Sequence, residues 1–366
     1  MTINDLRRFA VARSLFPPVA LKRAVERFGF VQADPIRAPA RAQDLTLRHR
    51  VKAYRAGDLE RRFAALGIEE DFFVNYGFVS RYVHALMHPR VDRSGWTPTR
   101  RARADLVLAF ITERGDVHPR QVDDHFAHGK VTNYWGGSSS ATTHLLEHMH
   151  YRGMLRVTRR EKGIRIYAIR EVTALPGITL TPRERVDALV DVIVQKYAPL
   201  PGLSLSFLVN RLRYGVPQWQ REVKPALLRA TQRLAHTRVD NIDWYWPAGE
   251  DPSSAIPDDQ VRLLAPFDPI VWDRRRFELL WGWPYRFEAY TPVAKRKLGY
   301  YALPLLWRDR VVGWGNLSVV DGELTANFGY AGAKPARGRA FKNALDHELT
   351  SVRAFLGLDS TSRAEL

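Results

Sequence analysis

Cysteine is absent from the 366-residue sequence. This absence excludes disulfide bonds, cysteine-ligated zinc, iron–sulfur clusters and a thiol nucleophile, so the fold must be held by packing alone. Runs of about 18 apolar residues are also absent, and the first residues lack the continuous apolar stretch of a secretory signal. The arginines there also fit a transit peptide, but an amphipathic first helix explains them equally well. We therefore expect a cytoplasmic protein without a membrane-spanning helix.

Motifs of several common enzyme classes are missing as well. The sequence contains neither of the glycine-rich loops that cradle phosphates, G-x-x-x-x-G-K-[ST] and G-x-G-x-x-G, and it contains no G-x-S-x-G nucleophile turn. ATP-driven chemistry, dinucleotide redox chemistry and serine-histidine-aspartate catalysis are therefore disfavoured.

Positive charge is what the sequence has in excess. The chain carries 56 Lys and Arg against 39 Asp and Glu, a net charge of +17, and its isoelectric point is near 10.2. Its hydrophobic content of 45% is enough for packed cores, and the length suggests about two to three domains. A polyanion is the natural partner of such a chain, and nucleic acid is the first candidate.

A repeated order of elements indicates the fold. Between residues 101 and 170, a helical apolar pattern ends at a glycine, and two further helices and a strand-turn-strand pattern follow. This order predicts a winged helix, and its 12 basic against 7 acidic residues suit a module that faces phosphates. The same order returns after Thr181-Pro182-Arg183-Glu184, a capping-box signature, and the N-terminal part is interpreted as a third, more divergent copy.

The C-terminal part has a different pattern. Short alternating stretches with Asp321-Gly322, a type I′ hairpin signal, predict a small barrel, and a last apolar helix follows. We therefore predict a mainly α fold with β: three tandem winged-helix (helix-turn-helix) units, a small C-terminal β-barrel and a terminal helix. The expected segments are winged helix 1 (1–95), winged helix 2 (96–175), winged helix 3 (176–255), the β-barrel (256–332) and the C-terminal helix (333–366).

One short motif suggests a metal enzyme. His144-Leu-Leu-Glu147-His148 is a literal H-x-x-E-H, the inverted zinc-protease pattern, with two imidazoles one helical turn apart. The same helix is needed as the third helix of a winged unit, where histidines on a solvated face are common. We disfavour the protease interpretation and predict no metal site.

The segment Gln32-Ala33-Asp34 is the candidate reaction centre. In extended backbone Gln32 and Asp34 project from one face, and Pro35 favours the extended state at Asp34. An amide and a carboxylate held side by side can bind one water, with the carboxylate taking its proton or shielding a developing cation. The alternative is an ordinary Asp-Pro turn with a polar residue nearby.

Basic residues follow this segment closely. Residues 1–60 hold 12 Lys and Arg against 6 Asp and Glu, and several of these arginines alternate with small or apolar residues, as phosphate contacts beside a packed core would. A second basic cluster accompanies aromatic residues in the predicted barrel, where Trp281, Trp283 and Trp307 are assigned to packing. We predict DNA contacts from Arg37, Arg41, Arg48, His49, Arg50, Lys52, Arg274, Arg275, Lys295 and Arg296.

These residues carry a resemblance to a known family. Gln32-Ala33-Asp34 resembles the Q-x-Q or Q-x-D catalytic motif of the winged-helix DNA glycosylases of the AlkZ and YcaQ group, and is closer to the YcaQ-like Asp form. The stretches LLAPFDPIVWDRRR and YRFEAYTPVAKRKLGYYALPLLW resemble the C-terminal barrel of that group. The middle residue, Ala33, is smaller than the usual bulky aliphatic residue, and the region around His84 matches only loosely; His84 is open to two interpretations, a DNA or substrate contact and a packed helix residue.

The resemblance implies a monofunctional DNA repair glycosylase. Such an enzyme hydrolyses the N-glycosidic bond of alkylated purines in duplex DNA, including N7-linked guanine crosslinks, without a metal or organic cofactor. Gln32 and Asp34 would hold the water, and a cationic N7-alkylguanine would leave without a general acid. A monomer in the bacterial cytoplasm or nucleoid is expected, without a membrane partner. The competing class is a non-catalytic winged-helix regulator that binds one operator sequence.

Overall fold

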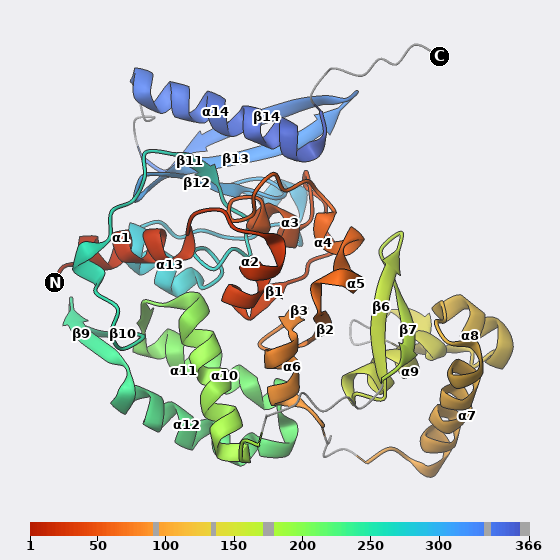
Figure 1. The fold of residues 1–366 in the computed structure, drawn as a ribbon. Helices are drawn as coiled ribbons and strands as arrows, with labels where there is room; N and C mark the ends of the chain where they lie inside the picture. Colours follow the sequence, from red (N-terminus) through yellow and green to blue (C-terminus); the bar gives the residue numbers. More distant parts are fainter. Residues whose placement is uncertain (91–94, 133–136, 171–178, 333–337, 359–366) are drawn as a thin grey trace. The chain divides into compact units, whose positions relative to one another are not determined.

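The computed structural model describes residues 1–90, 95–132, 137–170, 179–332 and 338–358 (Figure 1). The chain divides into two compact units, which are described separately. The first unit comprises Met1–Leu59, Val190–Leu208 and Leu227–Leu366, and the second comprises Glu60–Leu189 and Val209–Ala226. None of the helices in these described ranges combines the length and the apolar character that a membrane span requires.

The N-terminal residues of the first unit form the predicted helices and the extended segment that follows them. Thr2 caps the first helix in a capping box with Asp5, in which the Thr2 N–H donates to the Asp5 carboxylate over 2.7 Å. Gly29 ends the second helix with a φ of 65°, a conformation that favours glycine. The elements are α1 (Ile3–Ser14), α2 (Leu21–Phe28), β1 (Phe30–Gln32), α3 (Ala42–Leu47) and α4 (Asp58–Arg61).

The helices and hairpin expected between residues 181 and 246 are present in the predicted order. Thr181 and Glu184 form the predicted reciprocal bonds at the start of the first helix, with the Thr181 N–H donating to the Glu184 carboxylate over 2.8 Å. Three short strands form an antiparallel sheet in the order β8-β10-β9. The elements are α10 (Pro182–Tyr197), β8 (Leu200–Pro201), α11 (Gly202–Gly215), α12 (Gln220–Arg233), β9 (Ala235–Val239) and β10 (Ile242–Trp246).

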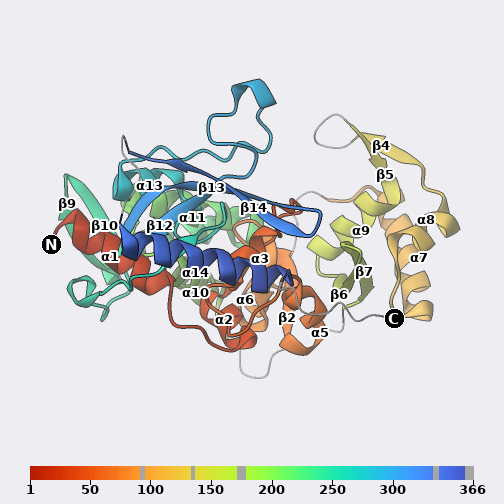
Figure 2. The same cartoon turned by 90° about the horizontal axis from the view of Figure 1, so that it is seen from above.

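A four-stranded antiparallel sheet, not a closed barrel, follows. Its order is β11-β12-β13-β14, and no pairing joins β11 to β14 in the described part of the chain. Asp321 and Gly322 both have positive φ, 51° and 80°, as the predicted type I′ turn between β13 and β14 requires. The predicted terminal helix is α14, which packs on the sheet at β11 (Figure 1). Figure 2 shows the length of this helix from above. The elements are β11 (Val261–Leu263), α13 (Arg274–Trp281), β12 (Leu303–Trp307), β13 (Arg310–Val320), β14 (Glu323–Tyr330) and α14 (Arg339–Leu356).

The predicted small barrel is an open sheet in the described part of the chain, where one of the short alternating stretches forms an ordered loop in place of a strand. The stretch YRFEAY, residues 285–290, has the alternation of a strand, but prolines at 284 and 292 flank it and cannot donate to a ladder. The Glu288 carboxylate instead accepts backbone N–H groups of Lys297 (2.8 Å), Leu298 (2.7 Å) and Gly299 (3.3 Å). These bonds fold the segment back on itself, so it adds no strand to the sheet.

The second unit contains the other predicted helix-helix-helix-hairpin order. Its core is formed by residues such as Val107, Leu146 and Tyr167, which belong to α7, α9 and β7. A hairpin of β4 and β5 that the sequence pattern did not predict lies between α8 and α9. The elements are α5 (Phe63–Leu66), β2 (Ile68–Phe72), β3 (Tyr76–Ser80), α6 (Arg81–Met87), α7 (Pro98–Arg114), α8 (Pro119–Phe126), β4 (Lys130–Thr132), β5 (Ser138–Ser140), α9 (Ala141–Tyr151), β6 (Leu155–Glu161) and β7 (Ile164–Ile169). The five-segment division into three winged helices, a sheet domain and a helix stays a prediction.

A buried ion pair connects the N-terminal helices of the first unit to its C-terminal residues. The guanidinium of Arg50 donates to both carboxylate oxygens of Asp268 over 2.7 and 3.0 Å, and both side chains are fully buried. Arg50 also donates to the backbone carbonyls of Ser14 and Thr46, each over 2.7 Å. The buried guanidinium and carboxylate are thus both hydrogen-bonded inside the protein, as buried charges must be.

We predict that Arg50→Met lowers the free energy of unfolding by about 3–5 kcal/mol, because it leaves the Asp268 carboxylate buried without its cation. Chemical denaturation measures the loss. The double variant Arg50→Met/Asp268→Asn carries no uncompensated charge and is the matched control, so it should be less destabilised than Arg50→Met. Equal destabilisation of the two proteins would contradict the importance of the charge pair.

Candidate active site

Gln32 and Asp34 are both buried in the first unit. Gln32 is the last residue of β1, and Asp34 follows it two positions later; each is 7% exposed. Phe30 and Val31 of the same strand are buried too, so this strand has no solvent-facing side. A polar pair in such a position must have partners for its hydrogen-bonding groups.

Trp272 is the partner of Gln32. Its indole N–H donates to the Gln32 side-chain oxygen over 2.6 Å, across 240 positions of sequence. The tryptophan lies at the end of a turn that Asp268 organises, because the Asp268 carbonyl accepts the N–H groups of Val271 (2.9 Å) and Trp272 (2.8 Å). With its oxygen engaged by the indole, the Gln32 amide directs its N–H donors elsewhere.

Asp34 is held by its own turn and by Gln43. The Ile36 N–H donates to the Asp34 carboxylate over 2.9 Å, and the Asp34 N–H donates to the Gln43 side-chain oxygen over 3.2 Å. Burial raises the pKa of Asp34 above its ordinary value, against the effect of the Ile36 hydrogen bond. A carboxylate with a raised pKa is a stronger base than an exposed one, and it retains acceptor sites beyond the one that Ile36 occupies.

Two tyrosines lie within the electrostatic range of Asp34. Burial, and then the Asp34 charge, raise the pKa of the enclosed Tyr301, and a partial desolvation, and then the Asp34 charge, also raise the pKa of Tyr290. Tyr290 is 79% exposed, whereas the Tyr301 hydroxyl is buried and has no hydrogen-bond partner among the described residues. Asp34 therefore lies in an aromatic environment, with one ring exposed and another enclosed.

Lys196 supports the strand that carries Gln32. Its ammonium group donates to the Phe30 carbonyl and lies 4.5 Å from the centre of the Phe30 ring and 5.3 Å from that of Phe28. The side chain is buried, and this burial lowers the pKa of Lys196 to about 7.

Three of the residues predicted to contact DNA have internal partners in the structure. Arg48 is paired with Glu348 of α14, and its side chain is 3% exposed. His49 shares a hydrogen bond of 3.0 Å with the Leu263 carbonyl, and Arg50 holds Asp268. A side chain that is engaged with internal partners has little surface to offer to a phosphate, and the alternation with apolar residues arose because these side chains turn toward internal partners.

The remaining predicted contacts differ in exposure. Arg41 is buried, and Arg274 is half-buried with its guanidinium 4.5 Å from the centre of the Tyr285 ring. Arg296 is half-buried and donates to the Thr291 carbonyl over 2.8 Å. Those exposed to solvent are Arg37, Lys52, Arg275 and Lys295.

The histidine clusters belong to the second unit. His84 stacks on His88 with ring centres 4.2 Å apart, and Asp71 contacts both, at 3.6 and 2.6 Å, which supports the interpretation of His84 as a packed helix residue. Asp71, His84 and His88 are close enough to hold a metal ion, and Arg90 donates to the other Asp71 oxygen over 3.0 Å. This is a buried hydrogen-bond network.

The H-x-x-E-H residues form no comparable cluster. His144 and His148 have ring centres 4.4 Å apart, while the Glu147 carboxylate accepts a bond of 3.0 Å from Arg165 of β7. The carboxylate that a zinc protease would use as its base thus serves as an ion-pair partner.

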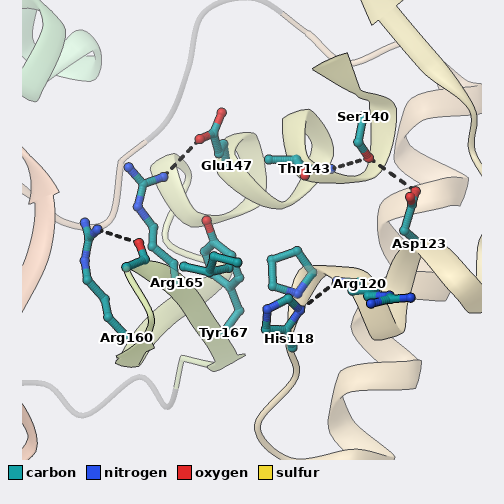
Figure 3. A pocket seen from close by; sticks show the side chains of 12 residues that line it. His118, Arg120, Asp123, Ser140, Thr143, Glu147, Arg160, Arg165 and Tyr167 are labelled. Carbon is teal, nitrogen blue, oxygen red and sulfur yellow. Dashed lines mark hydrogen bonds and ion pairs between the residues drawn. The ribbon is translucent and has the colours of Figure 1, made fainter. Parts of the chain in front are cut away.

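A cavity of about 460 Å³ lies near these residues, between α8, α9 and the β6–β7 hairpin (Figure 3). Its charged side chains are engaged with protein partners, since Arg160 pairs with Glu70 and Arg165 with Glu147. Ser140 donates to Asp123 over 3.2 Å at its other end. None of the residues predicted to react or to contact DNA lines this cavity.

The fold is that of a known DNA-processing enzyme. It matches the DNA glycosylase AlkZ of Streptomyces sahachiroi over 98% of this chain and 97% of that chain, with a TM-score of 0.64 and 15% sequence identity. Fold and site together define the class, a DNA glycosylase fold with a buried amide and carboxylate. Residues 25–355 match the family DNA glycosylase AlkZ-like, and the chain belongs to that family. The resemblance seen in the sequence is confirmed.

Sequence reasoning missed several residues of the site. Trp272 stands in LLAPFDPIVWDRRR, the stretch that carries the family resemblance, and its place directly before a basic run was a usable signal. No sequence pattern placed Gln43 or Tyr301 near Asp34, because their positions depend on backbone that is irregular or distant in the sequence.

We predict that Lys196→Met removes a pH-dependent part of the stability. The pKa of Lys196 is about 7 in the folded protein and 10.5 for an ordinary lysine, so the unfolded chain binds more protons between these values. The free energy of unfolding should therefore rise as the pH rises from about 7 to about 10. Denaturation at several pH values should give a smaller rise for Lys196→Met, while the exposed-lysine control Lys52→Met keeps the original slope. An unchanged slope in Lys196→Met would overturn this account of the buried ammonium.

Proposed function

We propose that this member of the AlkZ-like family is a monofunctional DNA glycosylase that hydrolyses the N-glycosidic bond of alkylated purines. N7-alkylguanine, including its interstrand crosslinks, is the proposed substrate. The observation that carries the proposal is the hydrogen bond from Trp272 to Gln32 beside the buried Asp34. A polar pair built into the interior with a dedicated indole donor is more than an Asp-Pro turn requires.

The proposed nucleophile is a water between the two side chains. The Gln32 oxygen is occupied by the indole, so the amide N–H group donates to the water oxygen and orients its lone pair. Asp34 accepts the proton as the water oxygen bonds to C1′ of the sugar. The bond from C1′ to the base nitrogen breaks, and the base leaves with the electron pair.

A cationic base makes a second acid unnecessary. An N7-alkylguanine carries a positive charge, and it becomes neutral when it takes the electron pair of the broken bond. The Asp34 carboxylate also stabilises the positive charge that develops on the sugar. One carboxylate thus performs the work that most glycoside hydrolases divide between two.

Duplex DNA is proposed to bind through cations that are exposed to solvent. Arg37, Lys52, Arg275 and Lys295 retain this role, together with the half-buried Arg296. Contacts with phosphates are independent of sequence and weaken steeply with salt. We also propose that the protein acts as a monomer.

Asp34→Asn is expected to reduce base excision by roughly 10²–10⁴-fold, because the amide cannot accept the proton of the water. The substrate is a duplex with a single N7-methylguanine, and alkali converts each abasic product into a strand break. Binding of the same duplex should stay within about twofold, since the phosphate contacts are untouched. EDTA should leave the wild-type rate unchanged.

Three results would contradict this function. Tight DNA binding without excision of small or bulky adducts would favour a non-catalytic regulator. Parallel loss of binding and excision in Asp34→Asn would assign Asp34 a structural role. Loss of excision in EDTA would require a metal that the proposed chemistry does not use.

Trp272→Phe tests the assigned orientation of Gln32. Phenylalanine keeps an aromatic ring in place but cannot donate a hydrogen bond, so the amide is free to turn. We expect kcat for excision to fall about tenfold, the value of one such bond, with KM nearly unchanged. An unchanged kcat would show that the indole N–H does not orient the reacting group.

A further inference from the structure

An exposed aromatic side chain lies next to the Trp272 indole. The ring centre of Phe207, on α11, is 6.3 Å from that of Trp272, with the planes 37° apart. Trp272 also contacts Tyr197, which is fully buried, with ring centres 5.5 Å apart. A series of rings therefore runs from the interior through the tryptophan that holds Gln32 to Phe207, which is 53% exposed.

Phe207 does not stand alone on its helix. Leu203, four residues earlier, is 60% exposed, and side chains four apart lie on the same helix face. Single exposed apolar residues are common on proteins, whereas an aromatic and an aliphatic side chain stacked on one face form an apolar strip. Here the strip adjoins the candidate reaction centre.

The charge of the helix favours DNA as the occupant. The sequence of α11, GLSLSFLVNRLRYG, contains two arginines and no acidic residue. The whole chain has a net charge of +17, which attracts a polyanion to the protein as a whole. Proteins that deform DNA commonly insert apolar side chains between base steps, where rings stack on bases and aliphatic groups fill the gap.

We propose that Phe207 stacks on a base of the duplex beside the damaged nucleotide, with Leu203 against the neighbouring sugar or base edge. This contact would hold the damaged nucleotide over Gln32 and Asp34, because Trp272 contacts both Phe207 and Gln32 directly. Phe207 is then a substrate-contacting residue that reads no sequence, since every base has a face on which a ring can stack. The proposal rests on the proposed glycosylase function and adds a substrate contact to it.

The test compares Phe207→Leu with Phe207→Trp. Leucine keeps apolar packing against Trp272 but has no ring, whereas tryptophan restores a stacking surface. With the N7-methylguanine duplex, Phe207→Leu should lose roughly 10- to 100-fold in kcat/KM, and Phe207→Trp should retain most of it. Leu228→Ala removes an equally exposed apolar side chain on α12 and should leave kcat/KM unchanged.

A second readout is independent of chemistry. The duplex carries 2-aminopurine next to the lesion, and each substitution is combined with Asp34→Asn so that no base is released. Binding of Asp34→Asn should change the fluorescence of 2-aminopurine, and so should binding of the double variant Asp34→Asn/Phe207→Trp. Binding of the double variant Asp34→Asn/Phe207→Leu should not change it. Melting temperatures within a few degrees of one another confirm that the variants fold.

The outcomes separate the two proposals. Suppose that the wild type excises the base, that Phe207→Leu does so equally well, and that the fluorescence response of its Asp34→Asn combination is unchanged. These results would overturn the stacking role and would leave the glycosylase function supported. Absence of wild-type excision overturns the glycosylase function, and the fluorescence comparison then decides the stacking contact alone. Equal losses in Phe207→Leu and Phe207→Trp would also overturn stacking, because they would show that only the native shape matters.

Discussion

The buried ion pair of Arg50 and Asp268 is the constraint on which the site depends. Bringing two charges out of water is costly, and the cost is offset here by the bidentate contact and by the carbonyls of Ser14 and Thr46. The same Asp268 organises the turn that ends at Trp272. A charge pair between distant parts of the sequence thereby sets the position of the indole, and the indole sets the orientation of Gln32.

This arrangement explains why the candidate reaction centre depends on the C-terminal part of the chain. The residues that carry out the proposed chemistry lie within three positions near the N-terminus, but their orientation is set from residues 268–272. Lys196 adds a third segment by holding the Phe30 carbonyl from α10. Several basic residues that would suit phosphate binding are used in internal pairs. Each pair removes one positive and one negative charge, so the pairs leave the chain's net charge of +17 unchanged.

Local signals in the sequence predicted local structure well. The capping box at Thr181, the turn at Asp321-Gly322 and the helical spacing of α14 are confirmed, because each depends on residues within a few positions of one another. The same reasoning failed for residues 285–290, where Glu288 folds the backbone into a loop, and for Arg48 and Arg50, whose partners lie more than 200 positions away. The motif predicted which residues could react. The partners that hold these residues in place could not be predicted from the sequence, because a hydrogen bond such as that of Trp272 depends on tertiary structure.

The most direct measurement is the structure of Asp34→Asn bound to a duplex with one N7-methylguanine, in which the substrate is trapped uncleaved. Our account predicts that C1′ of the damaged nucleotide lies beside Gln32 and the residue at position 34, with a water between them and the indole of Trp272 still bonded to Gln32. A damaged nucleotide bound elsewhere, for example in the cavity between α8, α9 and the β6–β7 hairpin, would contradict it.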